Sequence, residues 1–259
     1  MGSTLKTALF ALSLLGAAGC LQPAAPAAAP GAPAAAPKAP AAAPVAAEKP
    51  PAAPANPWES AVQAYEKADA KSAPPAGAVL FVGSSTIRMW GTLAEDFRPL
   101  KVIGRGVGGC QVPDMVHFVD RVVLRYRPRQ IVLYAGDNDV ASKRTAEQVL
   151  ADFRAFVGKV RPALPDAPVH FLSIKPSPSR ANVWPEAVKA NRLVREYCEK
   201  TPGLNYIDTA SVLLDAQGNA RPEYFLQDML HMNRRGYELW IPIIRAALVN
   251  ATASEHAEM

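Results

Sequence analysis

Histidine and cysteine are scarce in this sequence, and their scarcity limits the chemistry open to it. There are only four histidines and three cysteines in 259 residues. His117 and His170 fall within a predicted helix and a predicted strand, so we expect satisfied core histidines and few candidates for a metal site. Spacing gives no support for a disulfide between Cys110 and Cys198, and we expect free, partly buried thiols.

Charge of one sign and long apolar runs are also missing. The net charge is only +5, and the basic residues are spread among acidic ones rather than clustered. Nucleic-acid binding is therefore disfavoured. The apolar run over residues 7–18 has about a dozen residues, which is too short to span a bilayer.

That run has the features of an export signal. Lys6 precedes it, and small residues lead up to Cys20, which predicts a signal peptide over residues 1–19. The segment resembles the lipobox of bacterial lipoproteins, with Ala17 at the usual leucine position, and this implies lipidation of Cys20. Leu21 rather than aspartate follows, which favours a lipoprotein on the periplasmic side of the outer membrane. The alternative is an ordinary secretory signal with an incidental cysteine, and the protein would then be secreted.

Alanine and proline make up almost all of residues 22–57. Such a segment cannot form a packed core, and its prolines prevent a continuous helix. We expect residues 20–57 to comprise the lipidated Cys20 and an extended tether. At roughly 3 Å per residue, the tether would hold a domain away from a surface. Residues 58–259 are enough for one domain with one core.

Five short apolar runs recur in this domain, and each is nearly continuous rather than alternating. The pattern is typical of strands that are covered on both faces. Helical patterns separate the runs, which predicts an α/β fold with three layers, α/β/α, around a five-stranded parallel sheet. The runs are centred on residues 78–82, 101–103, 130–134, 169–172 and 204–207.

The helices are predicted from apolar spacing and from their end signals. Residues 112–126 form one candidate helix. Thr145 can cap a second, which ends near Val160. Pro185 can open a third, which runs to about Lys200. The other candidates are residues 57–71, 86–94 and 233–249, the last of them bent or broken near Pro242.

Ser85 is a candidate nucleophile because of its place in this pattern. In an open parallel sheet the working residues gather at the carboxyl ends of the strands. Ser85 follows the first strand and precedes a helix, so its amide is suited to an oxyanion. It could instead cap the helix, as could Ser84 or Thr86. Gly-x-Ser-x-Gly is absent, which excludes the nucleophile elbow of α/β-hydrolases.

Asp228 and His231 lie near the C-terminus, three residues apart. At this spacing a carboxylate can orient an imidazole on one turn, and a nearby serine would complete the parts of a serine hydrolase. Taken alone, the pair could also be a metal pair or a surface turn.

Two further loops end strands at the same edge. Residues 104–109 match the dinucleotide fingerprint Gly-x-Gly-x-x-Gly, with Asp137 or Asp139 as the ribose-binding acid. However, the motif follows the second strand, and an exported protein meets little nicotinamide cofactor. The alternatives are a tight loop or an amide aimed at an oxyanion, for which Gly109 is the candidate. Asn138 offers a side-chain NH₂ to the same oxyanion, or else forms a turn.

Four of these segments together resemble the SGNH (GDSL-like) hydrolase superfamily, in which Ser, Gly, Asn and His occur in this order. The blocks are residues 81–85, 105–109, 135–139 and 228–233. The resemblance covers the chain from about Ala78 to the C-terminal helix. Two departures, Ser84 in place of aspartate and Gly104 in place of asparagine, remove no catalytic group.

The resemblance assigns a role to each of these residues. It implies Ser85 as nucleophile, His231 as general base and Asp228 as its orienter. It also implies an oxyanion hole formed by the Ser85 amide, Gly109 and the Asn138 side chain. The chemistry needs no metal and no organic cofactor.

Residues 173–180 follow the fourth strand and should border the pocket. Lys175 and Arg180 are candidates to bind an anionic or polar part of the substrate, or they belong to a structural loop.

The resemblance therefore implies a serine esterase or acylhydrolase that cleaves carboxylic esters through an acyl-enzyme. An envelope tether makes small-molecule, glycan or lipid esters reasonable substrates, without a choice between them. An acyltransferase stays open, as does an SGNH-like lipoprotein that binds a glycan or a partner with little turnover. The sequence does not indicate an oligomeric state.

Overall fold

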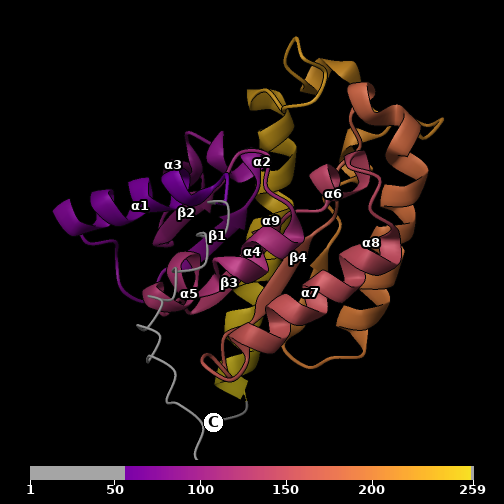
Figure 1. Cartoon of the computed structure of the whole chain (residues 1–259). Helices are drawn as coiled ribbons and strands as arrows, with labels where there is room; N and C mark the ends of the chain where they lie inside the picture. The colour runs from indigo at the N-terminus through magenta and orange to yellow at the C-terminus, as the bar shows by residue number, and fades with distance from the viewer. Residues whose placement is uncertain (1–55, 258–259) are drawn as a thin grey trace, which may run out of the picture. The chain divides into compact units, whose positions relative to one another are not determined.

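The computed structural model describes residues 56–257, with side chains described up to Leu248. The expected signal peptide, Cys20 and nearly all of the tether lie outside the described residues. Five parallel strands form one sheet in the order β2-β1-β3-β4-β5, which confirms the expected α/β fold (Figure 1). The strands are β1 (Val79–Gly83), β2 (Val102–Gly106), β3 (Gln130–Tyr134), β4 (Val169–Leu172) and β5 (Leu204–Ile207).

Helices cover both faces of the sheet because successive strand side chains point to opposite sides. Leu80 and Val82 of β1 belong to one core, and Val79 and Phe81 belong to the other. The first core is covered by α1 (Glu59–Lys71), α4 (Val112–His117), α5 (Val119–Val122), α7 (Ala146–Val160) and α8 (Trp184–Glu199) (Figure 1). The second is covered by α2 (Ser85–Arg88), α3 (Leu93–Asp96) and α9 (Arg234–Ala257). The remaining short elements are α6 (Asp137–Ala141), η1 (Leu124–Tyr126), η2 (Pro178–Val183), η3 (Ser211–Leu213) and η4 (Pro222–Tyr224).

Aromatic rings fasten α9 to its face of the sheet. Trp240 is fully buried, and its ring centroid lies 5.4 Å from that of Tyr134 on β3. Trp90 lies 4.7 Å from Tyr237, again on α9. Burial of each large apolar side chain contributes roughly 1.5–3 kcal/mol. Because α9 starts just after His231, this packing also fixes the loop that carries the histidine.

Two of the predicted helix boundaries are confirmed. Thr145 caps α7 with a reciprocal pair of bonds: its hydroxyl accepts from the Gln148 amide, and the Gln148 side chain accepts from the Thr145 amide. Pro185 lies in the first turn of α8, where a missing N–H costs nothing.

Three other helix predictions were wrong. The single helix expected over residues 112–126 is α4, α5 and η1, because Phe118 and Val123 leave helical geometry as they bury their side chains. The helix expected over residues 86–94 is interrupted around Gly91, a residue of low helix propensity, and becomes α2 and α3. The helix predicted to be bent or broken near Pro242 has no break there, since α9 runs through it while the side chains around it pack on the sheet; the bend stays a prediction.

The second strand is longer than expected. Gly104 and Gly106 were placed in a loop, but they belong to β2 and pair with Phe81 and Gly83 of β1. A Cβ on Gly106 would lie 2.1 Å from the Arg88 amide nitrogen. The glycines in this part of the motif therefore serve close packing of β2 against α2 rather than a phosphate loop.

The scarce residues behave only partly as expected. Cys110 and Cys198 are free and buried. His117 is exposed, so its core assignment was wrong. His170 is fully buried, but neither ring nitrogen has a partner in the described part of the chain, and burial lowers its pKa to about 4.

Residues 56–257 lack two kinds of feature. None of their helices has both the length and the hydropathy that a membrane span requires. The same residues contain no cluster of three or more His, Cys, Asp or Glu placed to hold a metal ion.

Candidate active site

Ser85 is the first residue of α2 and directly follows β1 and Ser84. Gly83 ends the strand with φ of 138°, and a Cβ there would lie 1.8 Å from the Tyr134 carbonyl oxygen. The Ser84 amide donates to that same oxygen at 2.9 Å. Only glycine lets β1 and β3 approach this closely, and the chain then turns sharply into α2 with Ser85 at the turn.

His231 is held by a compact turn over residues 228–231. Met229 takes the left-handed conformation, with φ of 54°. The turn lets one carboxylate oxygen of Asp228 accept from the Leu230 and His231 amides, each at 3.0 Å. The other oxygen lies 2.6 Å from His231 Nδ1.

Asp228 is well suited to fix the tautomer of the histidine. Its hydrogen bonds with His231, first from the ring and then from the amide, lower its pKa to about 2. The carboxylate is therefore ionised at neutral pH and keeps the proton on Nδ1. Nε2 is left as the proton acceptor.

The fold brings His231 to Ser85 across 146 positions of sequence, with Nε2 3.0 Å from the serine Oγ. Three side chains therefore form a continuous chain of hydrogen bonds from carboxylate to imidazole to hydroxyl. Such a chain can remove a proton from the hydroxyl as it attacks an electrophile.

A cleft of about 520 Å³ opens beside the two groups. The residues after β1 and β2 form one part of its wall, including Arg88 and Gly109. Asn138 and Arg180 form another part, and Trp58 closes the cleft from the start of α1. The cleft is wide enough for a small ligand.

The three expected oxyanion donors all line this cleft. Within residues 56–257, the amides of Ser85 and Gly109 donate no hydrogen bond. Gly109 has φ of 83°, and a Cβ there would lie 2.9 Å from the Trp58 ring. Asn138 donates through Nδ2 to the Cys110 carbonyl at 2.9 Å, and its NH₂ group has a second hydrogen to give.

Lys175 and Arg180 lie in different surroundings. Lys175 is buried, lies 3.6 Å from an Asp137 oxygen and does not line the cleft, so this geometry gives no support to its tentative assignment to substrate binding, which stays a prediction. Burial lowers the pKa of its amine. Arg180 does line the cleft, but it donates to Asn138 Oδ1 at 2.9 Å and lies 3.3 Å from Asp137.

Asp139 supports the part of the cleft wall that contains Asn138 and the Gly109 loop. It is fully buried and accepts from the Val112 amide with both oxygens at 3.2 Å, while Arg144 lies 3.5 Å away. Burial raises its pKa to about 7. Asp139 thus ties α6 to the start of α4, immediately after the Gly109 loop.

Arg88 and Trp58 line the cleft although the sequence did not single them out. Arg88 lies one turn after Ser85, and its guanidinium runs alongside Gly108, where a Cβ would be 2.8 Å from Nε. Its spacing from Ser85 was a usable signal. Trp58 had no such signal, because it precedes the first strand and reaches the cleft only through the packing of α1.

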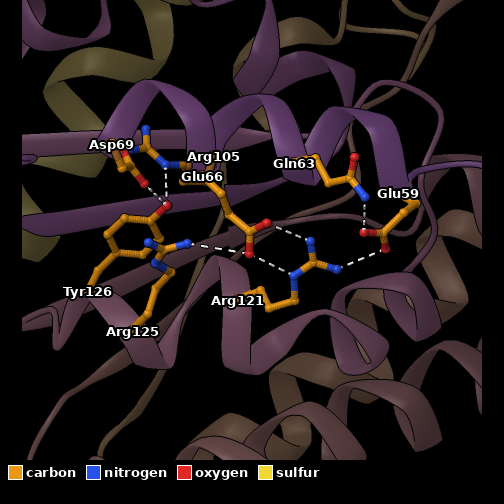
Figure 2. Close-up of polar contacts among 8 residues, drawn as sticks. All are labelled: Glu59, Gln63, Glu66, Asp69, Arg105, Arg121, Arg125 and Tyr126. Atoms are coloured by element: carbon orange, nitrogen blue, oxygen red, sulfur yellow. Dashed lines mark hydrogen bonds and ion pairs between the residues drawn. The ribbon is translucent and has the colours of Figure 1, made fainter. Parts of the chain in front are cut away.

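Polar contacts clasp α1 to the body of the domain (Figure 2). Arg121 donates to both oxygens of Glu66, at 2.8 and 2.7 Å, and to Glu59 at 2.8 Å. Further along the helix, Asp69 binds Arg105 and accepts from the Tyr126 hydroxyl. We call these six residues the α1 clasp. They hold the helix whose first turn places Trp58 against Gly109.

Solved structures share this fold. One is a protein from Streptococcus pneumonia named for platelet activating factor, with TM-score 0.66 and 21% identity, covering 74% of this chain and 92% of the other. A GDSL-like lipase from Bacteroides thetaiotaomicron has TM-score 0.63 and 20% identity, with 73% and 98% covered. A variant of an acetylxylan esterase from Geobacillus stearothermophilus has TM-score 0.54 and 15% identity, with 66% and 93% covered. At these identities the likeness shows the fold alone.

Family membership follows from sequence comparison. None of the curated proteins matches this chain at a significant level. The profile of the GDSL-like lipase/acylhydrolase family matches residues 82–239, which is more than half of the chain and spans Ser85, Gly109, Asn138, Asp228 and His231. The chain belongs to the GDSL-like lipase/acylhydrolase family.

Proposed function

We propose that the protein is a serine esterase that cleaves carboxylic esters through an acyl-enzyme. The observation that carries the proposal is the chain of contacts from Asp228 to His231 to Ser85, at 2.6 and 3.0 Å. Membership of an acylhydrolase family supports ester hydrolysis in general.

In the first half of the reaction, Ser85 Oγ attacks the ester carbonyl carbon while His231 Nε2 takes the hydroxyl proton. The carbonyl π pair moves to oxygen and gives a tetrahedral oxyanion. When the carbonyl re-forms, the C–O bond to the alcohol breaks, and His231 gives its proton to the leaving alkoxide. Asp228 stabilises the transient imidazolium and stays ionised.

In the second half, His231 takes a proton from water, which attacks the acyl carbon. Collapse of this second tetrahedral intermediate breaks the bond to Ser85 Oγ, and His231 returns the proton to the serine. The products are the carboxylic acid and the free enzyme. We assign the Ser85 and Gly109 amides and the Asn138 NH₂ as donors to the oxyanion in both steps.

Replacement of the nucleophile tests the proposal. Ser85→Ala and His231→Ala should each lower turnover of short aryl acetates by at least about 1,000-fold, because each removes a group that acts in the chemical step. Ser84→Ala is the matched control, since the Ser84 hydroxyl has no partner in the described part of the chain. Unchanged turnover by a folded Ser85→Ala protein would exclude the mechanism.

Kinetic experiments on the same proteins distinguish the esterase from two other functions. A module that binds glycan or a partner with little turnover would form no acyl-enzyme during a single-turnover reaction. An acyltransferase would form one, but would pass the acyl group to an added alcohol in preference to water. Comparison of acetyl with long-chain esters would then distinguish a glycan deacetylase from an enzyme of lipid esters.

We also propose that Cys20 is lipidated and anchors the protein in a bacterial envelope, with residues 22–57 as the tether. The supporting observation is the apolar run that ends in small residues before Cys20. Metabolic labelling with a fatty-acid probe should mark the wild-type chain and not Cys20→Ala. Absence of label on both would refute the anchor and leave the secreted alternative.

A further inference from the structure

We propose that Arg180 is a positioning residue for the oxyanion site, acting through the side-chain amide of Asn138 rather than on the substrate. The inference rests on the proposed esterase function and extends it to a residue outside the four family blocks. It also replaces the tentative substrate-binding role suggested by the sequence.

The amide of Asn138 is fixed at both ends. Arg180 Nη2 donates to Oδ1 at 2.9 Å, and Nδ2 donates to the Cys110 carbonyl at 2.9 Å. A rotated amide would place its NH₂ against the guanidinium and its oxygen against the carbonyl, so both contacts oppose rotation. One N–H of Asn138 is thereby left for the cleft in a single orientation.

Arg180 is itself held by a buried pair, Asp137 and Lys175. Its Nη1 lies 3.3 Å from an Asp137 oxygen, and Lys175 approaches the same oxygen at 3.6 Å. The Asp137 and Lys175 side chains are only 7% and 1% exposed. Since buried charges of this kind persist only when paired, the cluster gives Arg180 a rigid base. The planar guanidinium reaches two residues at once, with Nη1 in an ion pair with Asp137 and Nη2 in a hydrogen bond with Asn138.

Two physical effects follow for the oxyanion. Arg180 removes the rotational freedom of the Asn138 amide, so less reorganisation is needed when negative charge develops. A charged donor on Oδ1 also polarises the amide and strengthens donation from Nδ2. Both effects operate in the transition state and require the Asn138 side chain.

A double-mutant cycle tests this dependence. With a short aryl acetate, Arg180→Gln should lower kcat about tenfold in the wild-type background, with KM little changed. In an Asn138→Ala background the same change should lower kcat by no more than about twofold, because the amide on which Arg180 acts is gone. Arg180→Lys should recover part of the loss, since it keeps a cation near Asp137 without the fork.

Arg88→Gln is the matched control, because it removes a second guanidinium from the same cleft without touching Asn138. Its effect should be the same factor in both backgrounds. Thermal unfolding of every variant identifies any loss that comes from the fold.

Equal loss from Arg180→Gln in both backgrounds, or a rise in KM with kcat unchanged, would overturn the inference and show that Arg180 acts on the substrate. No loss in the wild-type background would also overturn it. These outcomes are distinct from failure of the esterase proposal, in which Ser85→Ala would keep its turnover.

Discussion

Two charged regions support residues of the cleft without lining it, and they differ in burial: the Asp137–Lys175 pair and the Arg121–Glu66 end of the α1 clasp. Beneath Asn138, the side chains of Lys175 and Asp137 are 1% and 7% exposed. At one end of the α1 clasp (Figure 2), Arg121 and Glu66 are 34% and 32% exposed, whereas Arg105 and Asp69 at its other end are 12% and 7% exposed. Charges in the first region interact in a low dielectric and cannot be hydrated when a partner is lost. The exposed charges of Arg121 and Glu66 exchange one set of partners for water at little cost.

The two regions have different roles: one fixes the position of the Asn138 amide, and the other attaches α1 to the domain. The buried region comes from loops that end β3 and β4, and it fixes the oxyanion corner to a single arrangement. The clasp joins α1, which precedes the sheet, to residues of β2, α5 and η1, and it attaches one wall of the cleft.

Loss of Asp137 should have the largest effect on stability. Asp137→Ala leaves Lys175 buried without its carboxylate, and such a change typically costs about 3–5 kcal/mol in the free energy of unfolding. Urea denaturation at neutral pH measures it. Adding Lys175→Met should recover much of the loss, because the uncompensated amine is then removed. A fully additive double variant would show that the two residues are not a coupled pair.

The pH dependence of stability should reveal Asp139, in the same buried region. Its pKa is about 7 in the folded protein, against an ordinary value of 3.8 for an aspartate. Between these values the unfolded chain has released a proton that the folded protein keeps, so stability falls as pH rises through this window. The slope is at most about 1.4 kcal/mol per pH unit, and Asp139→Asn should remove it.

Asp96 provides a control of opposite sign. Burial tends to raise its pKa, but hydrogen bonds from Arg234, Thr92 and Trp90 outweigh this and lower the pKa to about 2. Its contribution is present above about pH 4 and is lost as pH falls toward 2. The quantity to compare is the difference in the free energy of unfolding between wild type and Asp139→Asn. If that difference declined toward acid pH, as expected for Asp96, the interpretation of Asp139 as a buried acid with a raised pKa would be wrong.

The clasp should give the smallest effect. Arg121→Ala removes a two-pronged contact with Glu66, but exposed pairs of this kind contribute about 1 kcal/mol or less. The difference from wild type should shrink further in 1 M salt, where screening is strong. A loss as large as that of Asp137→Ala would erase the contrast between the two regions.

Much of this arrangement could be predicted from the sequence. Ser85, Asn138 and the residues 228–231 were predictable because they follow strands whose apolar runs are strong, and parallel strands gather their carboxyl ends. Asp228 and His231 are only three residues apart, so the prediction that they lie close together does not depend on the details of the fold. The helix break at Phe118 was missed because burial of its side chain overrode the local periodicity, and the break at Gly91 was missed because the apolar spacing outweighed the low helix propensity of glycine.

Side-chain roles were harder to predict than positions. In the sequence Lys175 and Arg180 are equivalent cations of one loop, and only the folded chain shows that Lys175 is buried against Asp137 while Arg180 reaches Asn138. Trp58 reaches the cleft through the packing of a helix outside the strand-helix pattern. No spacing rule connects such a residue to a site formed by later strands.

The central claim is that Ser85 is a nucleophile activated by His231. Reaction with a fluorophosphonate, in which the serine oxygen displaces fluoride from phosphorus, tests it most directly. Intact-mass analysis and peptide mapping should find one adduct per chain, on Ser85, with the rate strongly reduced in His231→Ala. Absence of the adduct under conditions where ester turnover proceeds, or an adduct on another residue that abolishes turnover, would contradict the account.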